Sequence, residues 1–307
     1  MLPYFLILLL IVLFQARYKL GEKIILFSDK KKFYFLAILL FLFAAFRGNG
    51  KGDYFTYKEY CESVTSWGIV MDNNFPAEIG FRFISYIINY LGMDSQWIII
   101  IMNFISITCM IMVINKYSEN KALSLLVFFP IFLSFDMHAS RTAVAISISF
   151  LSMKYIIERK FLRYIFFIML ASTFHRSVII AILLYSIALM NINTVLAILI
   201  MFLSIIISRF IDINQLIVEI LDFVNLDGLS RKYYSYTQSA EYGYAFKLYD
   251  PRLTLNIIIY FVSKLVCNLK EKKYIICINA ILLSNILTIL LSNNIIFVIR
   301  FTSYFNV

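Results

Sequence analysis

The most regular feature of the sequence is a succession of long apolar runs separated by short polar stretches. A transmembrane helix needs about 20 mainly apolar residues to cover a hydrocarbon core of about 30 Å, and such runs recur along the whole chain. Several runs are short, which local thinning of the bilayer or broken helices facing a cavity can accommodate. The predicted membrane segments are residues 2–16, 33–46, 97–115, 122–135, 142–157, 162–174, 177–191, 195–211, 253–269, 274–291 and 295–307.

This pattern predicts an all-α integral membrane protein, a polytopic bundle of about 10–12 transmembrane helices with extracytoplasmic loops. Residues 79–92 are also apolar, but their short length and the central Arg82 favour an interfacial or re-entrant helix. No repeat or low-complexity linker divides the chain, so residues 1–307 are expected to form a single polytopic membrane domain. The last apolar run is short for a span, so we expect the natural protein to continue beyond Val307.

Composition agrees with a membrane location and excludes a water-soluble fold. Of the 307 residues, 62% are hydrophobic and only 15% are charged. The net charge of +10 comes from Lys and Arg scattered between apolar runs, without the basic arm or stripe that would indicate nucleic acid. The four cysteines form no CxxC pair, which argues against a zinc or redox motif.

The basic residues also predict which connections lie on each side of the membrane. Residues 17–32, 116–121, 158–163 and 270–273 are rich in Lys and Arg and are expected to be cytoplasmic. Residues 47–96 and 212–252 then become the larger extracytoplasmic loops, with residues 136–141, the 175–176 junction and residues 293–294 on the same side. This topology requires residues 162–191 to form two helices that meet near His175.

The first outer loop, RGNGKGDYFTYKEY from Arg47 to Tyr60, combines glycines, an acid and evenly spaced tyrosines. Asp53 is a candidate base, and a spacing of three puts Tyr54 and Tyr57 on one helical face, where their rings could stack on sugars. The alternative is that these tyrosines simply belong to the interfacial aromatic belt.

Basic residues at other outer positions are candidate ligands for a diphosphate. The His175 and Arg176 pair interrupts two apolar runs, where a charge costs roughly 2.5–3.5 kcal/mol at mid-helix. Arg141 opens a helix, although an arginine at a membrane boundary can also merely extend to water. Arg252 ends a tyrosine-rich loop, and Arg300 lies about 9 Å along a helix in the last run. These loops have no DxD pattern, which makes a magnesium site implausible and a diphosphate site plausible.

Short motifs distributed over most of the chain resemble the EpsG family of bacterial exopolysaccharide proteins, which is related to the Wzy oligosaccharide-repeat polymerases. Their order and spacing together carry the resemblance. The motifs are the Arg47–Tyr57 segment with Gly52-Asp53-Tyr54, Glu78-x-Gly80-Phe81, Arg141-Thr142-Ala143, His175-x-Ser177 and Arg300-x-x-x-Tyr304-Phe305.

The resemblance implies a metal-independent glycosyltransferase, a multi-pass protein of the bacterial cytoplasmic membrane that acts at its outer face. Undecaprenyl-diphosphate-linked oligosaccharides would be both donor and acceptor, and no metal or other cofactor is expected. Further partners would be membrane lipid and, in the cell, a chain-length regulator and a flippase, but no nucleic acid. Asp53 and His175 would be catalytic; the residues expected to bind diphosphate or substrate are Arg47, Arg141, Arg176, Arg252, Arg300, Tyr54 and Tyr57.

Two other functions remain open on the sequence. A lipid-linked oligosaccharide flippase would also be polytopic, but its charged residues would be spread over both faces and the midplane. A membrane O-acetyltransferase would need a catalytic histidine near an inward-opening tunnel, whereas His138 and His175 are both predicted on the outer side.

Overall fold

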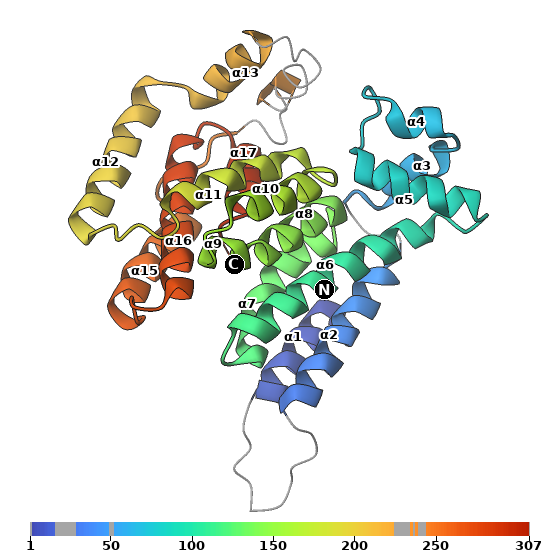
Figure 1. The fold of residues 1–307 in the computed structure, drawn as a ribbon, viewed down its shortest axis with the longest axis horizontal. Coiled ribbons are helices and arrows are strands. Elements are labelled where there is room, and N and C mark those ends of the chain that lie inside the picture. The colour runs from blue at the N-terminus through green and yellow to red at the C-terminus, as the bar shows by residue number, and fades with distance from the viewer. Residues whose placement is uncertain are drawn as a thin grey trace, which may run out of the picture. The chain divides into compact units, whose positions relative to one another are not determined.

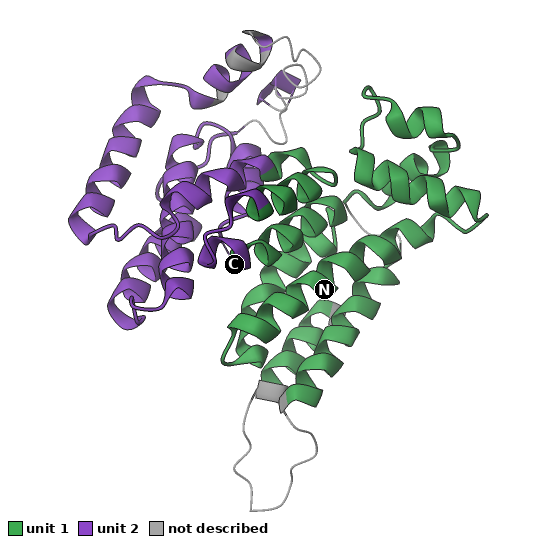
Figure 2. Ribbon diagram, viewed as in Figure 1, with its two compact units in different colours: residues 1–153, 163–178, 307 green, residues 154–162, 179–306 purple. Residues whose placement is uncertain are grey.

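A computed structural model describes residues 2–15, 29–48, 52–223, 234–235, 237–238 and 244–306, and these residues are helical with connecting turns and loops. Most of the basic connection predicted at residues 17–32 lies outside the described residues. The chain divides into two compact units (Figure 2). Unit 1 contains residues 1–153 and 163–178, and unit 2 contains residues 154–162 and 179–306. The all-α class is confirmed, whereas a single polytopic domain stays a prediction.

Unit 1 is built on a bundle of apolar helices (Figure 1). Helix α6 packs against α2 and α8, and α1 packs against α7. Leu36, Leu40, Ile99 and Val144 are among the fully buried side chains of this bundle, so aliphatic packing contributes to its core. The helices are α1 (Leu2–Gln15), α2 (Asp29–Ala45), α6 (Gln96–Tyr117), α7 (Lys121–Ile131) and α8 (Ser140–Leu151).

The first predicted outer loop folds into three short helices that lie together beside one end of α6 (Figure 1). These are α3 (Tyr54–Ser63), α4 (Trp67–Met71) and α5 (Ile79–Tyr90). The Asn89 side chain donates to the carbonyls of Cys61 at 2.6 Å and Val64 at 2.8 Å, which fixes α5 to the end of α3. Arg82, 2% exposed, donates to the Asp72 carbonyl just after α4. The segment predicted at residues 79–92 is therefore a helix. Its buried Arg82 satisfies a carbonyl at the C-terminal end of the neighbouring helix α4.

The α-helical hydrogen bonding of α7 gives way to a π-helical turn before the chain reaches the predicted outer side. Pro130 lies inside the helix, and Phe132–Asp136 form a π-helical turn, η1. Proline cannot donate the next helical hydrogen bond, and π-turns are frequent near functional sites. Residues 137–139 then connect η1 to α8.

The predicted interruption near His175 is present. Helix α10 (Phe161–Ser172) ends just before it, and helical structure resumes with the 3-10 turn η2 (Arg176–Ala181) and α11 (Ile182–Ile187). Helix α11 ends at Ile187, before the end of the predicted segment at residue 191. In unit 2 the Asn279 amide donates to the carbonyls of Ile187, Ala188 and Met190 at 2.8–3.1 Å, so the chain can leave the helix there with its acceptors satisfied.

Unit 2 is arranged around α16 (Lys272–Leu290), which packs against α11, α12, α15 and α17. Its helix starts follow local rules. The Asn193 and Asn294 side chains accept from the backbone N–H groups of Leu196 and Ile296, and Asp250 precedes Pro251 at the first position of α15. The bounds are α9 (Met153–Ile157), α12 (Thr194–Phe210), α13 (Ile213–Phe223), α15 (Pro251–Val266) and α17 (Ile295–Thr302).

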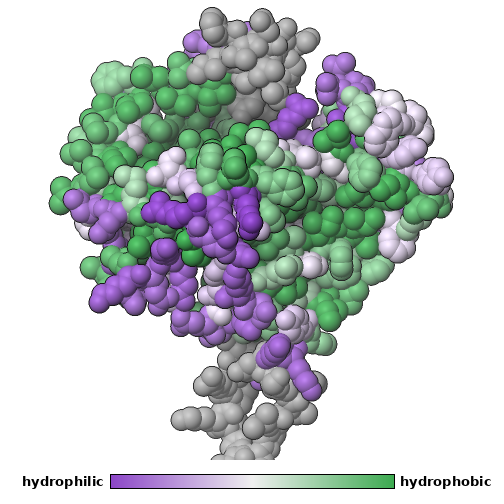
Figure 3. All heavy atoms as spheres, viewed as in Figure 1, coloured by the Kyte–Doolittle hydropathy of each residue, from purple (hydrophilic) through white to green (hydrophobic). Residues whose placement is uncertain are grey.

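Large apolar side chains are exposed over much of the surface, as the green areas of Figure 3 show. On α12, Val195 is 75% exposed, Phe202 59% and Phe210 84%, which suits contact with lipid and not with water. Helices α6 and α16 are long and apolar enough to cross a membrane, and several shorter helices are apolar. The number of crossings stays a prediction.

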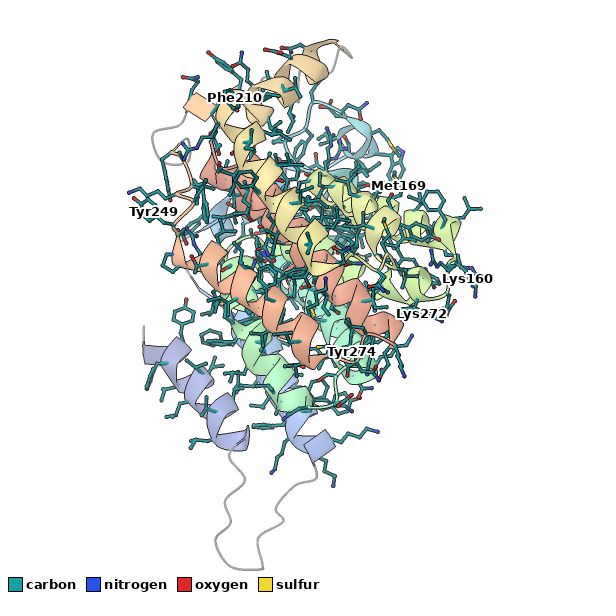
Figure 4. All side chains as sticks on the ribbon, turned by 90° about the vertical axis from the view of Figure 1, so that its left-hand side faces the viewer. Lys160, Met169, Phe210, Tyr249, Lys272 and Tyr274 are labelled. Atoms are coloured by element: carbon teal, nitrogen blue, oxygen red, sulfur yellow. The ribbon has the colours of Figure 1, made fainter. Side chains whose placement is uncertain are left out.

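Contacts within unit 2 join segments that the charge pattern assigns to the same side. The Lys272 ammonium lies 3.5 Å from the Ile157 carbonyl, and Lys160 and Lys272 lie toward one side of Figure 4, with Tyr249 toward the other. The Phe246 N–H donates to the Ser292 carbonyl at 2.7 Å. This grouping agrees with the predicted sidedness, which itself stays a prediction.

Candidate active site

Two glycines bring four connections of unit 1 together. Gly52 has φ = +96°, and a Cβ there would lie 2.9–3.1 Å from atoms of His138, while the Asp53 N–H donates to the His138 carbonyl at 3.1 Å. The Gly80 N–H likewise donates to the Thr173 carbonyl at 2.7 Å, and a Cβ there would lie 2.7 Å from Thr173 Oγ1. Only glycine permits such close backbone approach. The first outer loop is thereby fixed against the segments that carry Arg141 and His175.

The centre of this arrangement is an acid that contacts two basic side chains. Glu78 Oε2 accepts from Arg141 Nη1 at 2.7 Å, and Glu78 Oε1 lies 3.5 Å from His175 Nδ1. The three side chains are 9%, 13% and 15% exposed, respectively. Polar contacts this poorly hydrated are held in a defined geometry, because water competes little for their atoms.

Arg141 is also held by aromatic rings. Its guanidinium carbon lies 5.1 Å from the Tyr57 ring centroid and 5.7 Å from the Phe81 ring centroid, within the range of cation–π attraction. Tyr57 is 1% exposed, and its burial raises its pKa to about 12. The structure thus places the Tyr57 ring against Arg141 and inside unit 1, where it supports the guanidinium.

The environment of Glu78 favours its ionised form. Burial on its own would raise the pKa of this carboxyl, but the close contact with His175 and the charge of Arg141 outweigh burial and lower the pKa to about 2. Glu78 is therefore a carboxylate at any pH at which the protein is expected to work.

Arg47 has contacts of its own inside unit 1. It is 8% exposed, donates through Nη1 to the Asp136 carbonyl and lies 3.2 Å through Nη2 from Ser140 Oγ. The Ser140 hydroxyl itself donates to the Asp136 carbonyl at 3.1 Å. Arg47 therefore connects the end of α2 to the turn between η1 and α8, the turn that also carries His138.

Asp53 stands at the N-cap position of α3, yet its side chain makes no capping hydrogen bond. An acid at this position usually accepts from the first turn of its helix, so capping does not account for it here. The side chain is half-buried and lies within electrostatic range of Arg47, Tyr57 and Arg141. Arg141 is thus a basic group that Asp53 shares with Glu78.

The remaining predicted residues of unit 1 differ in exposure. Arg176 is exposed beside His175, as is His138 beside Gly52. Tyr54 is 7% exposed, and its hydroxyl lies 2.5 Å from the Gln96 side-chain oxygen, which attaches α3 to the start of α6.

Arg252 and Arg300 belong to unit 2. Arg252 makes a bidentate contact with the Asp250 carboxylate, at 2.9 Å through Nε and 2.8 Å through Nη2, and its side chain is 62% exposed. Arg300 is half-buried on α17. Their participation in a site with the residues of unit 1 stays a prediction.

The sequence reasoning did not assign roles to Glu78 and Asp136. Glu78 stands in one of the family motifs, and this was the signal that could have selected it. Asp136 is 1% exposed, and its Oδ1 has no hydrogen-bond partner among the described residues. Within the described residues, no group of three or more His, Cys, Asp or Glu side chains is placed to hold a metal ion.

A helical protein with exposed apolar helices and a buried acid–arginine–histidine cluster at its polar connections fits the class of helical membrane proteins. A model of the EpsG family matches residues 30–307, nearly the whole chain. The chain therefore belongs to the EpsG family, which is associated with exopolysaccharide polymerisation at the membrane. Searches among curated proteins and among solved structures returned no match.

Proposed function

We propose that the chain polymerises undecaprenyl-diphosphate-linked oligosaccharide repeat units into a surface polysaccharide at the outer face of the bacterial cytoplasmic membrane. The observation that carries the proposal is the convergence of Arg47, Asp53, Glu78, Arg141 and His175 in unit 1 of an EpsG-family chain. Acids, a histidine and arginines at one place are the groups that glycosyl transfer from a diphosphate requires.

In the proposed reaction, a hydroxyl of a new lipid-linked repeat unit attacks the anomeric carbon of the growing chain. The bond between that carbon and the diphosphate oxygen breaks, and undecaprenyl diphosphate leaves with the electron pair. Asp53 or His175 accepts the proton of the attacking hydroxyl, and arginine side chains stabilise the charge that grows on the leaving diphosphate. No nucleotide sugar and no metal ion take part.

Among the arginines, exposure supports different roles. Arg176 is exposed beside His175, whereas Arg47 is buried and Arg141 half-buried, so Arg176 is proposed to meet the diphosphate. Arg252 and Arg300 of unit 2 stay proposed diphosphate ligands on the family resemblance. A planar guanidinium offers bidentate donors that match phosphate oxygens.

The test is deletion of the gene in its host, followed by gel separation of the surface glycan. Loss of a polymerase leaves glycans of one repeat unit, and complementation with the wild-type gene restores the ladder. Complete loss of surface glycan would indicate a flippase, and a normal ladder with altered acetylation would indicate an O-acetyltransferase. A biochemical test uses purified protein in liposomes with the lipid-linked repeat unit: polymer should form in the presence of EDTA.

A further inference from the structure

Within the described residues of unit 1, Glu78 has a basic side chain next to each of its two carboxylate oxygens. Oε2 pairs with Arg141 at 2.7 Å, and Oε1 faces His175 Nδ1 at 3.5 Å. The carboxylate is 9% exposed, so neither contact is a chance encounter of flexible surface groups. A carboxylate placed at one nitrogen of an imidazole determines which nitrogen carries the proton.

We propose that Glu78 is a positioning residue of the polymerisation reaction: it holds His175 through Nδ1, so that Nε2 accepts the proton of the acceptor hydroxyl. The proposal rests on the proposed function and selects His175 as the base. It also gives Arg141 a different task from the one the family resemblance implies. Arg141 neutralises and orients Glu78 and does not bind the diphosphate.

Further contacts hold both the backbone next to Glu78 and its partner Arg141 in place. Glu78 directly precedes α5, and Gly80 in the first turn of that helix donates to the Thr173 carbonyl, two residues before His175. Arg141, the partner of Oε2, lies against the rings of Tyr57 and Phe81. The carboxylate therefore cannot turn away from His175 without breaking the Arg141 pair, which is what orientation of a catalytic imidazole needs.

The proton balance of the step is simple. The proton of the acceptor hydroxyl moves to Nε2 as the oxygen bonds to the anomeric carbon, and the imidazole then carries one positive charge. The adjacent carboxylate of Glu78 stabilises this charge, as the buried acid of a serine-protease triad does for its histidine. The electron pair of the broken bond leaves on the diphosphate, and the imidazolium returns its proton to water after the product departs.

Several charged or titratable groups are linked by electrostatic interactions to the cluster of Glu78, Arg141 and His175, and they contribute to its pH response. They come from α3 and its cap position, from α5, from α8 and from the segment of His175 itself. These groups are Asp53, Tyr57, Glu78, Arg82, Arg141 and Arg176.

The experiment measures polymer formation by purified full-length protein in liposomes containing the undecaprenyl-diphosphate-linked repeat unit, from about pH 5 to 9. Glu78→Gln is compared with wild type, with His175→Ala and with the double variant; Glu59→Gln removes an exposed acid of α3 as a matched control. We expect kcat of Glu78→Gln to fall on the order of 10²-fold, with KM nearly unchanged, whereas Glu59→Gln behaves as wild type.

Two results separate positioning from a merely structural role. Removing the carboxylate makes the imidazole harder to protonate, so the acidic limb of the pH profile should move to lower pH by about one unit or more in Glu78→Gln. If Glu78 acts only through His175, the double variant is no slower than His175→Ala alone. If Glu78→Gln does not fold, Glu78→Asp replaces it in the same comparison of single and double variants, because aspartate keeps the charge but has a shorter side chain.

The outcomes are distinguishable from failure of the proposed function. If wild-type protein forms no polymer from the lipid-linked repeat unit, the proposed function itself is wrong. If wild type polymerises but kcat and the pH profile of Glu78→Gln match those of Glu59→Gln, or the Glu78 and His175 effects multiply, the positioning role is overturned while the polymerase function stands.

Discussion

Replacement of Gly80 by alanine tests the contact on which the geometry of the candidate active site depends. A Cβ on Gly80 would lie 2.7 Å from Thr173 Oγ1, 2.8 Å from the Thr173 carbonyl oxygen and 3.1 Å from the carbonyl carbon. Two of these atoms belong to the backbone, and the carbonyl oxygen also accepts the Gly80 N–H at 2.7 Å. Rotation of one side chain therefore cannot make room, and the first turn of α5 must move away from residues 173–175.

The magnitude follows from three opposing effects. Crowding in a packed site costs about 1–3 kcal/mol, and weakening the Gly80 hydrogen bond costs about 1 kcal/mol more. Alanine returns about 0.5–1 kcal/mol through its higher helix propensity. The net expectation is a loss of about 1–3.5 kcal/mol in the free energy of unfolding. The same movement lengthens the 3.5 Å contact between Glu78 and His175, so polymerisation should fall as well.

Gly48→Ala is the matched control, because no atom lies within 4 Å of a Cβ built at that position. Both variants and wild type would be purified in one detergent for thermal unfolding, and each gene would be expressed in the deletion strain for gel analysis of the glycan. Gly80→Ala should unfold several degrees lower and give a shortened ladder, with Gly48→Ala close to wild type. Equal midpoints and equal ladders for the two variants would refute the close contact at Thr173.

The remaining predictions concern single residues outside that contact. Asp53→Asn should shorten the glycan while the protein stays in the membrane, since Asp53 has no capping bond to lose; a normal ladder would remove it from the reaction. Arg300→Lys should insert normally but make little polymer, because lysine keeps the charge and loses the bidentate fork; wild-type ladders would show that charge alone suffices. In cysteine-free protein, a cysteine at Tyr249 should react with an impermeant reagent in intact cells and one at Lys270 should not, and the reverse pattern would overturn the topology. Glu78, with a pKa lowered from 4.5 to about 2, should stabilise wild type fully above pH 4.5, and this contribution should be lost as pH falls toward 2; thermal midpoints that fall equally in wild type and Glu78→Gln would contradict it.

Much of the helical arrangement could be predicted because it depends on local patterns. Apolar runs predicted the main helices, and the polar His175 and Arg176 pair predicted the interruption that the structure shows between Ser172 and Arg176. The early end of α11 could not be predicted this way. It depends on Asn279, which supplies donors from a distant helix to carbonyls that an apolar run cannot reveal.

The candidate site was only partly predictable for the same physical reason. Asp53, Arg141 and His175 stand out locally, as polar residues next to glycine or at the ends of apolar runs. Glu78 does not stand out locally, since its partner Arg141 is 63 positions away and no neighbouring residue indicates that the acid is buried. Arg47 was predicted to bind diphosphate or substrate, and its protein contacts, 89 and 93 positions away, could not be read from the sequence. Long-range pairing of this kind is a property of the fold.

These long-range contacts also explain how the largely apolar unit 1 can bury several arginines and remain stable. A buried guanidinium is tolerated only when its donors meet carbonyls or carboxylates. Arg47 meets the Asp136 carbonyl, Arg82 the Asp72 carbonyl and Arg141 the Glu78 carboxylate. Such arginines hold the connections together, and a diphosphate that drew one away would leave a protein acceptor unpaired. Binding of the proposed lipid-linked diphosphate therefore breaks the fewest protein contacts at an arginine that is already hydrated. In unit 1 the exposed Arg176 beside His175 meets that condition.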